Sequence, residues 1–321
     1  MKRLSILLVS TVLSLLAAEG ALRILRPGPV GEILFRIDHL WGLDVSAGAR
    51  ALQRDSVLGY RPVLGGSLYD LHGARYNHYS LEKPTDKRRI LFLGDSVTFR
   101  GRLIDAIAAE YGREEYEFWN AGVEGYSTLE EAINYRENVA EIEEDHVILV
   151  VHPNDALSTP ISFPAEDGRV AIYRPGRGSW ELDPQLVRAC YLYALYEGMR
   201  FGKLDATPME GARERCRTGL ELLRQETTRR GARLTVLRFP LMSGPGDWLS
   251  MEREWHELGG DLCSELGLEC VDLKPLFEAA LAESPLVDIE AYRELDGDTW
   301  HPSDVAAQAL ARGLRRSGFE L

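Results

Sequence analysis

Two short polar strings, far apart in the chain, together supply a serine and the groups that could activate it. Gly-Asp-Ser occupies residues 94–96 and Asp-Thr-Trp-His occupies residues 298–301. A serine hydroxyl becomes an effective nucleophile when an imidazole takes its proton and a carboxylate holds that imidazole in place. Asp298 and His301 stand three residues apart, so one short loop can bring them together. Ser96, His301 and Asp298 are therefore the candidate catalytic residues.

Ser96 is expected at the carboxyl end of a buried strand. The apolar run at residues 89–93 directly precedes the Gly-Asp-Ser string and has the length of a strand in a parallel sheet. Open α/β sheets bind their ligands at this edge. Residues 120–125 and residues 152–155 each follow another apolar, strand-like run. All three strings are therefore expected at the same edge of one sheet.

The order of these strings resembles that of the GDSL, or SGNH, family of serine esterases and lipases, from about residue 89 to the C-terminus. The resemblance implies that Ser96 is the nucleophile of a Ser-His-Asp triad with His301 and Asp298. It also implies an oxyanion hole formed by the backbone N–H groups of Ser96 and Gly125 and by the side-chain amide of Asn154. The implied reaction is hydrolysis of a small-molecule, lipid or glycan ester without a cofactor. The acyl chain and the alcohol stay open.

Two other functions are alternatives to hydrolysis. An extracytoplasmic O-acyltransferase would form the same acyl-serine and pass the acyl group to a sugar hydroxyl of a polysaccharide. A non-catalytic carbohydrate or lipid binder could keep the same scaffold, but the presence of every catalytic residue type argues against it.

Two residues beside these strings differ from the family pattern. His152 stands where the family usually has a small residue, and we interpret it as a packed or solvent-facing histidine rather than a substrate contact. Arg100 stands where a glycine is frequent, so we expect a positive charge at the rim of the site.

Strands alternate with helices from residue 89 onwards. The expected strands are residues 89–93, 116–119, 146–151, 233–239 and 269–272, and the expected helices are residues 103–111, 129–140, 210–230, 251–266 and 302–315. This alternation predicts an α/β fold with a parallel sheet covered on both faces. The resemblance implies a three-layer α/β/α sandwich with the flavodoxin-like strand order. Residues 157–184, rich in Pro and Gly, are interpreted as an insertion that forms a wall of the substrate pocket.

The N-terminus has the layout of a signal peptide or a membrane anchor. Lys2 and Arg3 precede an uncharged apolar run at residues 4–18, which Glu19 and Arg23 follow. A helix over residues 4–25 is long enough to span a bilayer, with Lys2 and Arg3 on the cytoplasmic side and the remainder of the chain outside. We prefer this uncleaved anchor to a signal cleaved before Ala21, which would give a secreted protein. Nothing before Arg26 is expected to pack into the folded domain.

The chain is accordingly divided into three parts. Residues 1–26 are the signal peptide or anchor, residues 27–87 are a linker and a small region ahead of the core, and residues 88–321 are the hydrolase domain. The sequence leaves the oligomeric state open.

Composition excludes several classes of partner. The formal net charge of −13 would repel a phosphate backbone, so nucleic acid is not expected to bind. Seven histidines and four cysteines form no spacing typical of a metal site, and none is predicted. The cysteines fit either buried free thiols or disulfides of an extracytoplasmic protein. Any disulfide is expected to join Cys263 to Cys270, which enclose the shorter loop.

Overall fold

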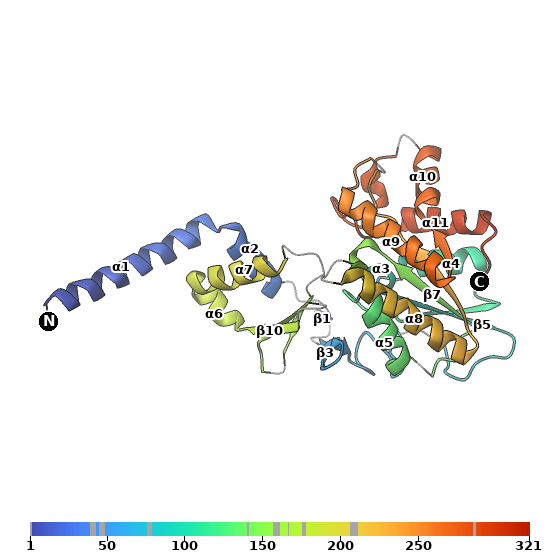
Figure 1. Cartoon of the computed structure of the whole chain (residues 1–321), viewed down its shortest axis with the longest axis horizontal. Coiled ribbons are helices and arrows are strands. Elements are labelled where there is room, and N and C mark those ends of the chain that lie inside the picture. The colour runs from blue at the N-terminus through green and yellow to red at the C-terminus, as the bar shows by residue number, and fades with distance from the viewer. Residues whose placement is uncertain are drawn as a thin grey trace.

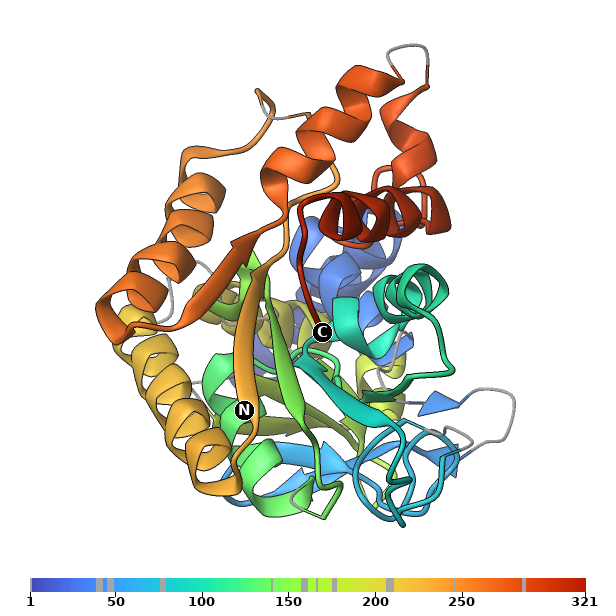
Figure 2. The ribbon, with the colours of Figure 1, turned by 90° about the vertical axis from the view of Figure 1, so that its right-hand side faces the viewer.

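The computed structural model of the protein describes residues 2–38, 43–44, 49–75, 79–139, 141–156, 161–165, 167–174, 178–205, 211–244, 246–284 and 287–321. Its main body is a parallel sheet between two layers of helices, and a long N-terminal helix extends away from that body (Figures 1 and 2).

The central sheet has five parallel strands in the order β12-β11-β7-β5-β6. In chain order these strands are β5 (Arg88–Gly94), β6 (Tyr116–Asn120), β7 (His146–Val151), β11 (Arg233–Arg238) and β12 (Glu269–Asp272). Numbered along the chain, the order across the sheet is 2-1-3-4-5, which is the flavodoxin-like order. The predicted α/β sandwich is therefore confirmed. The winding reverses between β5 and β7, and such a switch point is where sheets of this type bind ligands.

Alternate residues of each strand point to opposite helical layers. Ile90 and Phe92 of β5 pack against one layer, and Leu91 and Leu93 pack against the other. The first layer contains α4 (Arg102–Tyr111), α10 (Lys274–Glu283) and α11 (Asp304–Arg316). The second contains α5 (Thr128–Asn138), α8 (Ala212–Arg230) and α9 (Ser250–Leu266).

All predicted strands and helices of the core are present, with ends shifted by a few residues. Helix α10 was not among the expected helices, and Pro275 lies in its first turn. Proline is tolerated in the first turn of a helix, where its missing N–H has no intrahelical partner.

Residues 157–184 contain more regular structure than expected. Three antiparallel strands form a second sheet, β8 (Ile161–Pro164), β9 (Val170–Arg174) and β10 (Gly178–Leu182). Helices α6 (Pro184–Ala189) and α7 (Tyr191–Asp205) follow. Residues 157–160, which directly follow the Asn154 string, lie outside the described residues, so the predicted pocket wall stays a prediction.

The region ahead of the core packs on the β6–α5 connection. It includes α2 (Gly28–Asp38) and the short strands β1 (Leu43–Asp44), β2 (Ala49–Arg50), β3 (Leu52–Asp55) and β4 (Gly59–Pro62). Tyr60 of β4 is fully buried in an apolar cluster with Val123, Tyr126 and Phe163. A segment remote in sequence therefore supports the loop that carries Gly125.

The expectation that nothing before Arg26 packs into the domain was wrong. Helix α1 (Lys2–Leu25) docks its last turns on α7, with Leu22 against the apolar cluster between α2 and α7. The two carboxylate oxygens of Glu19 accept hydrogen bonds from the backbone N–H groups of Tyr191 and Leu192, each at 2.9 Å. Arg23 pairs with Glu19 at 2.8 Å and lies over the Tyr191 ring. Glu19 therefore satisfies backbone donors at the start of α7.

The four cysteines are free thiols in the structure. Cys263 of α9 and Cys270 of β12 lie close enough for their side chains to hydrogen-bond, but the disulfide considered for this pair is not formed.

A buried ion pair fixes the start of the core sheet. Arg89 of β5 is fully buried and its Nε donates to Glu117 of β6 at 2.6 Å. Its remaining N–H groups donate to the carbonyl oxygens of Ser80, Leu81 and Ile142 at 2.6–2.8 Å. The Arg89 guanidinium thus links β5 to β6, and it also binds the segment before β5 and the segment between α5 and β7.

We expect Arg89→Met to lower the free energy of unfolding by about 3–5 kcal/mol, because it leaves the carboxylate of Glu117 buried without its cation. The neighbouring Arg88 is exposed, so Arg88→Met should cost less than about 1 kcal/mol and serves as the control. Urea unfolding of both variants in detergent measures the difference. Equal losses of unfolding free energy in the two variants would contradict a special role for Arg89.

Candidate active site

Ser96 lies where β5 passes into a short helix at the switch point of the sheet. It is the first residue of α3 (Ser96–Phe99), and Oδ1 of Asp95 accepts a hydrogen bond from the Val97 N–H at 2.9 Å. A Cβ at Gly94 would come within 2.1 Å of Thr98 Oγ1 and 3.1 Å of the Val150 carbonyl oxygen. The chain can therefore turn this sharply between β5 and α3 only with glycine at position 94.

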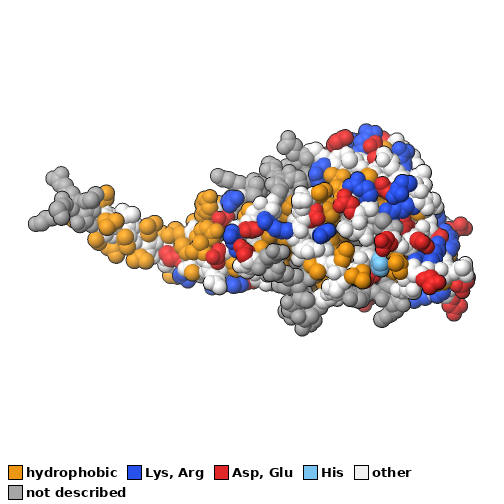
Figure 3. Space-filling model, turned by 90° about the horizontal axis from the view of Figure 1, so that it is seen from below, with side chains coloured by type: hydrophobic (Ala, Val, Ile, Leu, Met, Phe, Trp, Pro, Cys, Tyr) orange, Lys and Arg blue, Asp and Glu red, His pale blue; other side chains and the backbone are white. Residues whose placement is uncertain are grey.

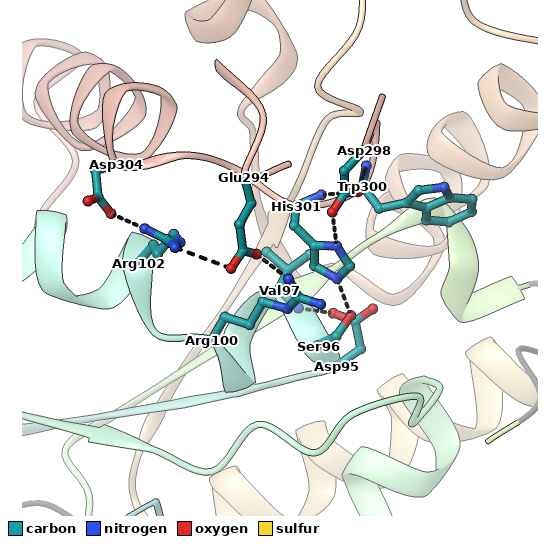
Figure 4. A network of polar contacts seen from close by, with 10 residues as sticks. All are labelled: Asp95, Ser96, Val97, Arg100, Arg102, Glu294, Asp298, Trp300, His301 and Asp304. Carbon is teal, nitrogen blue, oxygen red and sulfur yellow. Dashed lines mark hydrogen bonds and ion pairs between the residues drawn. The ribbon is translucent and has the colours of Figure 1, made fainter. Parts of the chain in front are cut away.

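His301 stands between Ser96 and Asp298 (Figure 4). The His301 Nε2 atom lies 2.9 Å from Ser96 Oγ, and its Nδ1 atom lies 2.8 Å from Asp298 Oδ2. The other Asp298 oxygen accepts the backbone N–H groups of Trp300 at 2.9 Å and of His301 at 3.2 Å. The structure thus brings together the three residues predicted for acid–base and nucleophilic chemistry. Each is within hydrogen-bonding reach of the next.

The carboxyl group of Asp298 is held in its ionised form. Partial burial raises its pKa, but the hydrogen bonds from the His301 ring and from the two backbone N–H groups outweigh burial and lower the pKa to about 2. An ionised Asp298 fixes the Nδ1–H tautomer of His301, which leaves the Nε2 lone pair directed at the Ser96 hydroxyl.

A network of ion pairs ties the His301 loop to the helices that follow Ser96. Glu294 pairs with Arg100 and, at 3.2 Å, with Arg102, which also contacts Asp304 at 2.5 Å. The backbone N–H of Glu294 donates to the carbonyl of His301 at 3.0 Å. Figure 4 shows this network beside Ser96, Asp298 and His301. The charge expected at Arg100 is therefore present, and Glu294 neutralises it.

The same corner contains the one group of potential metal ligands found among the described residues. Ligand atoms of Glu294, Asp298 and His301 lie within 4.8 Å of one another. Glu294 is already paired with two arginines, and Asp298 with His301. The donors of this group are therefore engaged in the ion pairs and hydrogen bonds that hold the loop.

Gly125 stands at a backbone position that only glycine can occupy. Its φ of +73° is left-handed, and a Cβ would meet Ile161 at 2.2 Å, so only glycine fits. The Tyr60 hydroxyl donates to the carbonyl of the preceding Glu124 at 2.6 Å and fixes this peptide. In the described part of the chain, no acceptor takes up the N–H of Gly125 or of Ser96.

The side-chain amide of Asn154 is held at both ends. Its Nδ2 donates to Asp95 Oδ2 at 2.5 Å, and its Oδ1 lies 2.9 Å from His152 Nδ1. Asn154 belongs to the 3₁₀ turn η1 (Pro153–Ala156), directly after β7. One Nδ2 hydrogen is used by Asp95, and the second remains available to another acceptor.

Sequence reasoning missed the residues that support the site. Tyr60, Glu294 and the second role of Asp95, beyond capping α3, were not identified. Each acts through a contact remote in sequence, so no local pattern reveals it. His152 was identified, and the interpretation as a packed histidine is confirmed, since it is 1% exposed.

Several solved structures of esterases and lipases are similar in fold to this chain. No protein-family profile and no curated protein matches this chain. A catalytic variant of an acetylxylan esterase from Geobacillus stearothermophilus is 18% identical, with a TM-score of 0.47, over 74% of this chain and 97% of the esterase. A protein described as a GDSL-like lipase from Parabacteroides merdae is 15% identical, with a TM-score of 0.46, over 74% and 99% of the two chains. A lipase/acylhydrolase from Enterococcus faecalis is 18% identical, with a TM-score of 0.43, over 72% and 94%.

We expect Asp298→Asn to lower kcat for ester hydrolysis by ~10²- to 10⁴-fold, because asparagine cannot hold His301 in the required tautomer or stabilise its cation. Asp296 lies two residues away in the same loop and is exposed, so Asp296→Asn should leave kcat unchanged. Steady-state hydrolysis of a p-nitrophenyl ester at pH 8 compares the two. A small effect of Asp298→Asn on kcat would show that the Asp298 carboxylate is not needed for the reaction.

Proposed function

We propose that the protein is a serine ester hydrolase in which Ser96, His301 and Asp298 act as a triad. The observation that carries this proposal is the 2.9 Å contact between Ser96 Oγ and His301 Nε2, with Asp298 2.8 Å from the opposite ring nitrogen. This arrangement lies at the switch point of the sheet, at the edge where β5, β6 and β7 end ahead of Ser96, Gly125 and Asn154.

The reaction would begin when Ser96 Oγ attacks the ester carbonyl carbon and its proton passes to His301 Nε2. The carbonyl oxygen becomes an oxyanion, which the N–H groups of Ser96 and Gly125 and the amide of Asn154 would stabilise. Each such preorganised donor lowers the barrier by ~3 kcal/mol. His301 then gives its proton to the leaving alcohol as the C–O bond breaks. Water attacks the acyl-serine in the same manner, which releases the acid and restores the serine.

Substitution of Ser96 tests this proposal. Ser96→Ala should abolish hydrolysis of short p-nitrophenyl esters and labelling by an organophosphonate, because only an activated hydroxyl forms the phosphorus–oxygen bond. Ser303, which caps α11, is the control, and Ser303→Ala should be labelled and active. Normal turnover by Ser96→Ala would refute the proposal. Labelling without hydrolysis of any ester, but with transfer to a sugar acceptor, would make the protein an O-acyltransferase.

We also infer that helix α1 is a retained membrane anchor. Residues 6–25 form the one helix in the described part of the chain that is long and apolar enough to cross a membrane, although a signal sequence meets the same criterion. Its large apolar side chains from Ile6 to Leu16 are exposed (Figure 3). Cleavage before Ala21 would remove Glu19, whose carboxylate binds the start of α7. The docking of Glu19 therefore favours retention of the helix.

Docking also constrains how the protein sits on the bilayer. The undocked apolar run at residues 4–18 has fifteen residues, or about 22 Å of helix, whereas the hydrocarbon layer is about 30 Å thick. The last turns of α1 and the adjoining ends of α6 and α7 would therefore lie at the membrane surface. Leu186 of α6 and Ile24 and Leu25 of α1 present exposed apolar side chains there. The catalytic body would then stand directly outside the membrane.

Two truncations test the anchor and its docking. The full chain should stay in the membrane pellet after an alkaline carbonate wash, whereas deletion of residues 2–18 should release soluble protein with unchanged Tm. Deletion of residues 2–26 should lower Tm by about 2–8 °C, because α7 loses Glu19 and Arg23. Recovery of full-length precursor as soluble protein beginning at Ala21 would show a cleaved signal. Equal Tm values for both truncations would contradict the docking.

A further inference from the structure

We propose that His152 is a positioning residue for the oxyanion hole, which fixes the side-chain amide of Asn154 so that its N–H faces the reacting ester. This proposal rests on the proposed function and assigns a role to a residue outside the triad and the three oxyanion donors.

The contacts of His152 lead to Asn154 and not to a substrate. The side chain is almost completely buried, so it offers little surface to a bound ester. Its Nδ1 lies 2.9 Å from Asn154 Oδ1, and its backbone N–H donates to Asp155 Oδ2 at 2.9 Å. His152 thus holds the same short turn by its main chain and by its ring.

The two partners of the Asn154 amide fix which way it faces. Oδ2 of Asp95 accepts from the Nδ2 group, and the Nδ1–H of His152 donates to the Oδ1 atom. A flipped amide would place its oxygen against the Asp95 carboxylate and its N–H₂ group against the His152 N–H. The contact with Asp95 would then be repulsive, and the contact with His152 would be repulsive unless the ring proton moved to Nε2, where it would have no partner among the described residues. His152 therefore keeps the second Nδ2 hydrogen of Asn154 pointing in a single direction.

The ring is held in the state that donates from Nδ1. Burial lowers the pKa of His152 to about 4, so the imidazole is neutral at neutral pH and carries one N–H. Among the described residues, the Nε2 atom has no hydrogen-bond partner, whereas Nδ1 faces the Asn154 oxygen. The proton therefore belongs on Nδ1.

The His152 ring also connects the two halves of the site. It packs on the Trp300 ring, with centroids 5.1 Å apart, and on Phe239, with centroids 6.0 Å apart. Trp300 lies in the loop between Asp298 and His301, and its backbone N–H binds Asp298. His152 therefore touches the oxyanion turn through its Nδ1 atom and the triad loop through its ring face. A small residue at this position would provide neither contact.

Two substitutions separate the hydrogen bond from the ring packing. His152→Phe keeps an aromatic ring beside Trp300 but removes the donor. His152→Asn removes the ring, while its amide N–H₂ can occupy the place of Nδ1–H. We expect His152→Phe to lower kcat ~10- to 100-fold with KM nearly unchanged, because the loss is in transition-state stabilisation. His152→Asn should retain kcat within ~3-fold.

A double-mutant cycle shows whether His152 acts through Asn154. In the Asn154→Ala background, His152→Phe should cause no further loss of kcat, because the amide it positions is already absent. His146 is a buried histidine at the start of β7, at the opposite end of the strand from the site, and pairs with Thr235 at 2.8 Å, so His146→Asn is the control and should keep kcat. Should His152→Phe fail to fold, His152→Ala replaces it in the same cycle.

Three results would overturn the proposal. One is equal loss of kcat in His152→Phe and His152→Asn, which would indicate packing alone. The second is a loss of kcat from His152→Phe in the Asn154→Ala background that equals its loss in the otherwise unchanged protein. The third is a rise in KM without a change in kcat, which would indicate a contact with the ground-state substrate. Each can occur while Ser96→Ala is inactive, so a failure of this proposal is distinct from a failure of the esterase assignment.

Discussion

The geometry of the site depends on two hydrogen bonds that the side chain of Asp95 accepts. This side chain is fully buried, and its two oxygens accept from the Val97 N–H at the start of α3 and from Asn154 Nδ2 in the turn after β7. These segments follow the two strands between which the winding reverses. One side chain therefore fixes the position of the turn that carries Ser96 relative to the side-chain amide of Asn154.

The remaining groups of the site are fixed by segments that come from elsewhere in the chain. Tyr60, from the region ahead of the core, holds the peptide before Gly125. Ion pairs of Glu294 hold the His301 loop against the helices after Ser96. His152 lies between the Asn154 turn and the Trp300 ring. Ser96 itself needs only the strand–helix turn, whereas the groups that act on it depend on contacts across the fold.

The difference between local and non-local contacts explains what the sequence could predict. Continuous apolar runs such as residues 146–151 identified the core strands, because a parallel strand that is buried on both faces is apolar at every position. The strings that follow three of those runs identified Ser96, Gly125 and Asn154, and the separate Asp-Thr-Trp-His string identified Asp298 and His301. The docking of Glu19 was missed because a charge after an apolar run is equally typical of a membrane boundary. The sheet β8–β10 was missed because its strands are short and separated by Pro and Gly.

The acyl-enzyme is the most direct test of this account. The full-length protein is mixed rapidly with p-nitrophenyl acetate, p-nitrophenol release is followed on the millisecond scale, and samples quenched in acid are mapped by peptide mass spectrometry. We predict an acetyl group on the peptide that contains Ser96 and on no other peptide, formed before steady-state turnover begins. An acetyl group on another residue, or steady turnover in which no acetyl-Ser96 can be trapped even with a slowly hydrolysed ester, would contradict a serine nucleophile at this position.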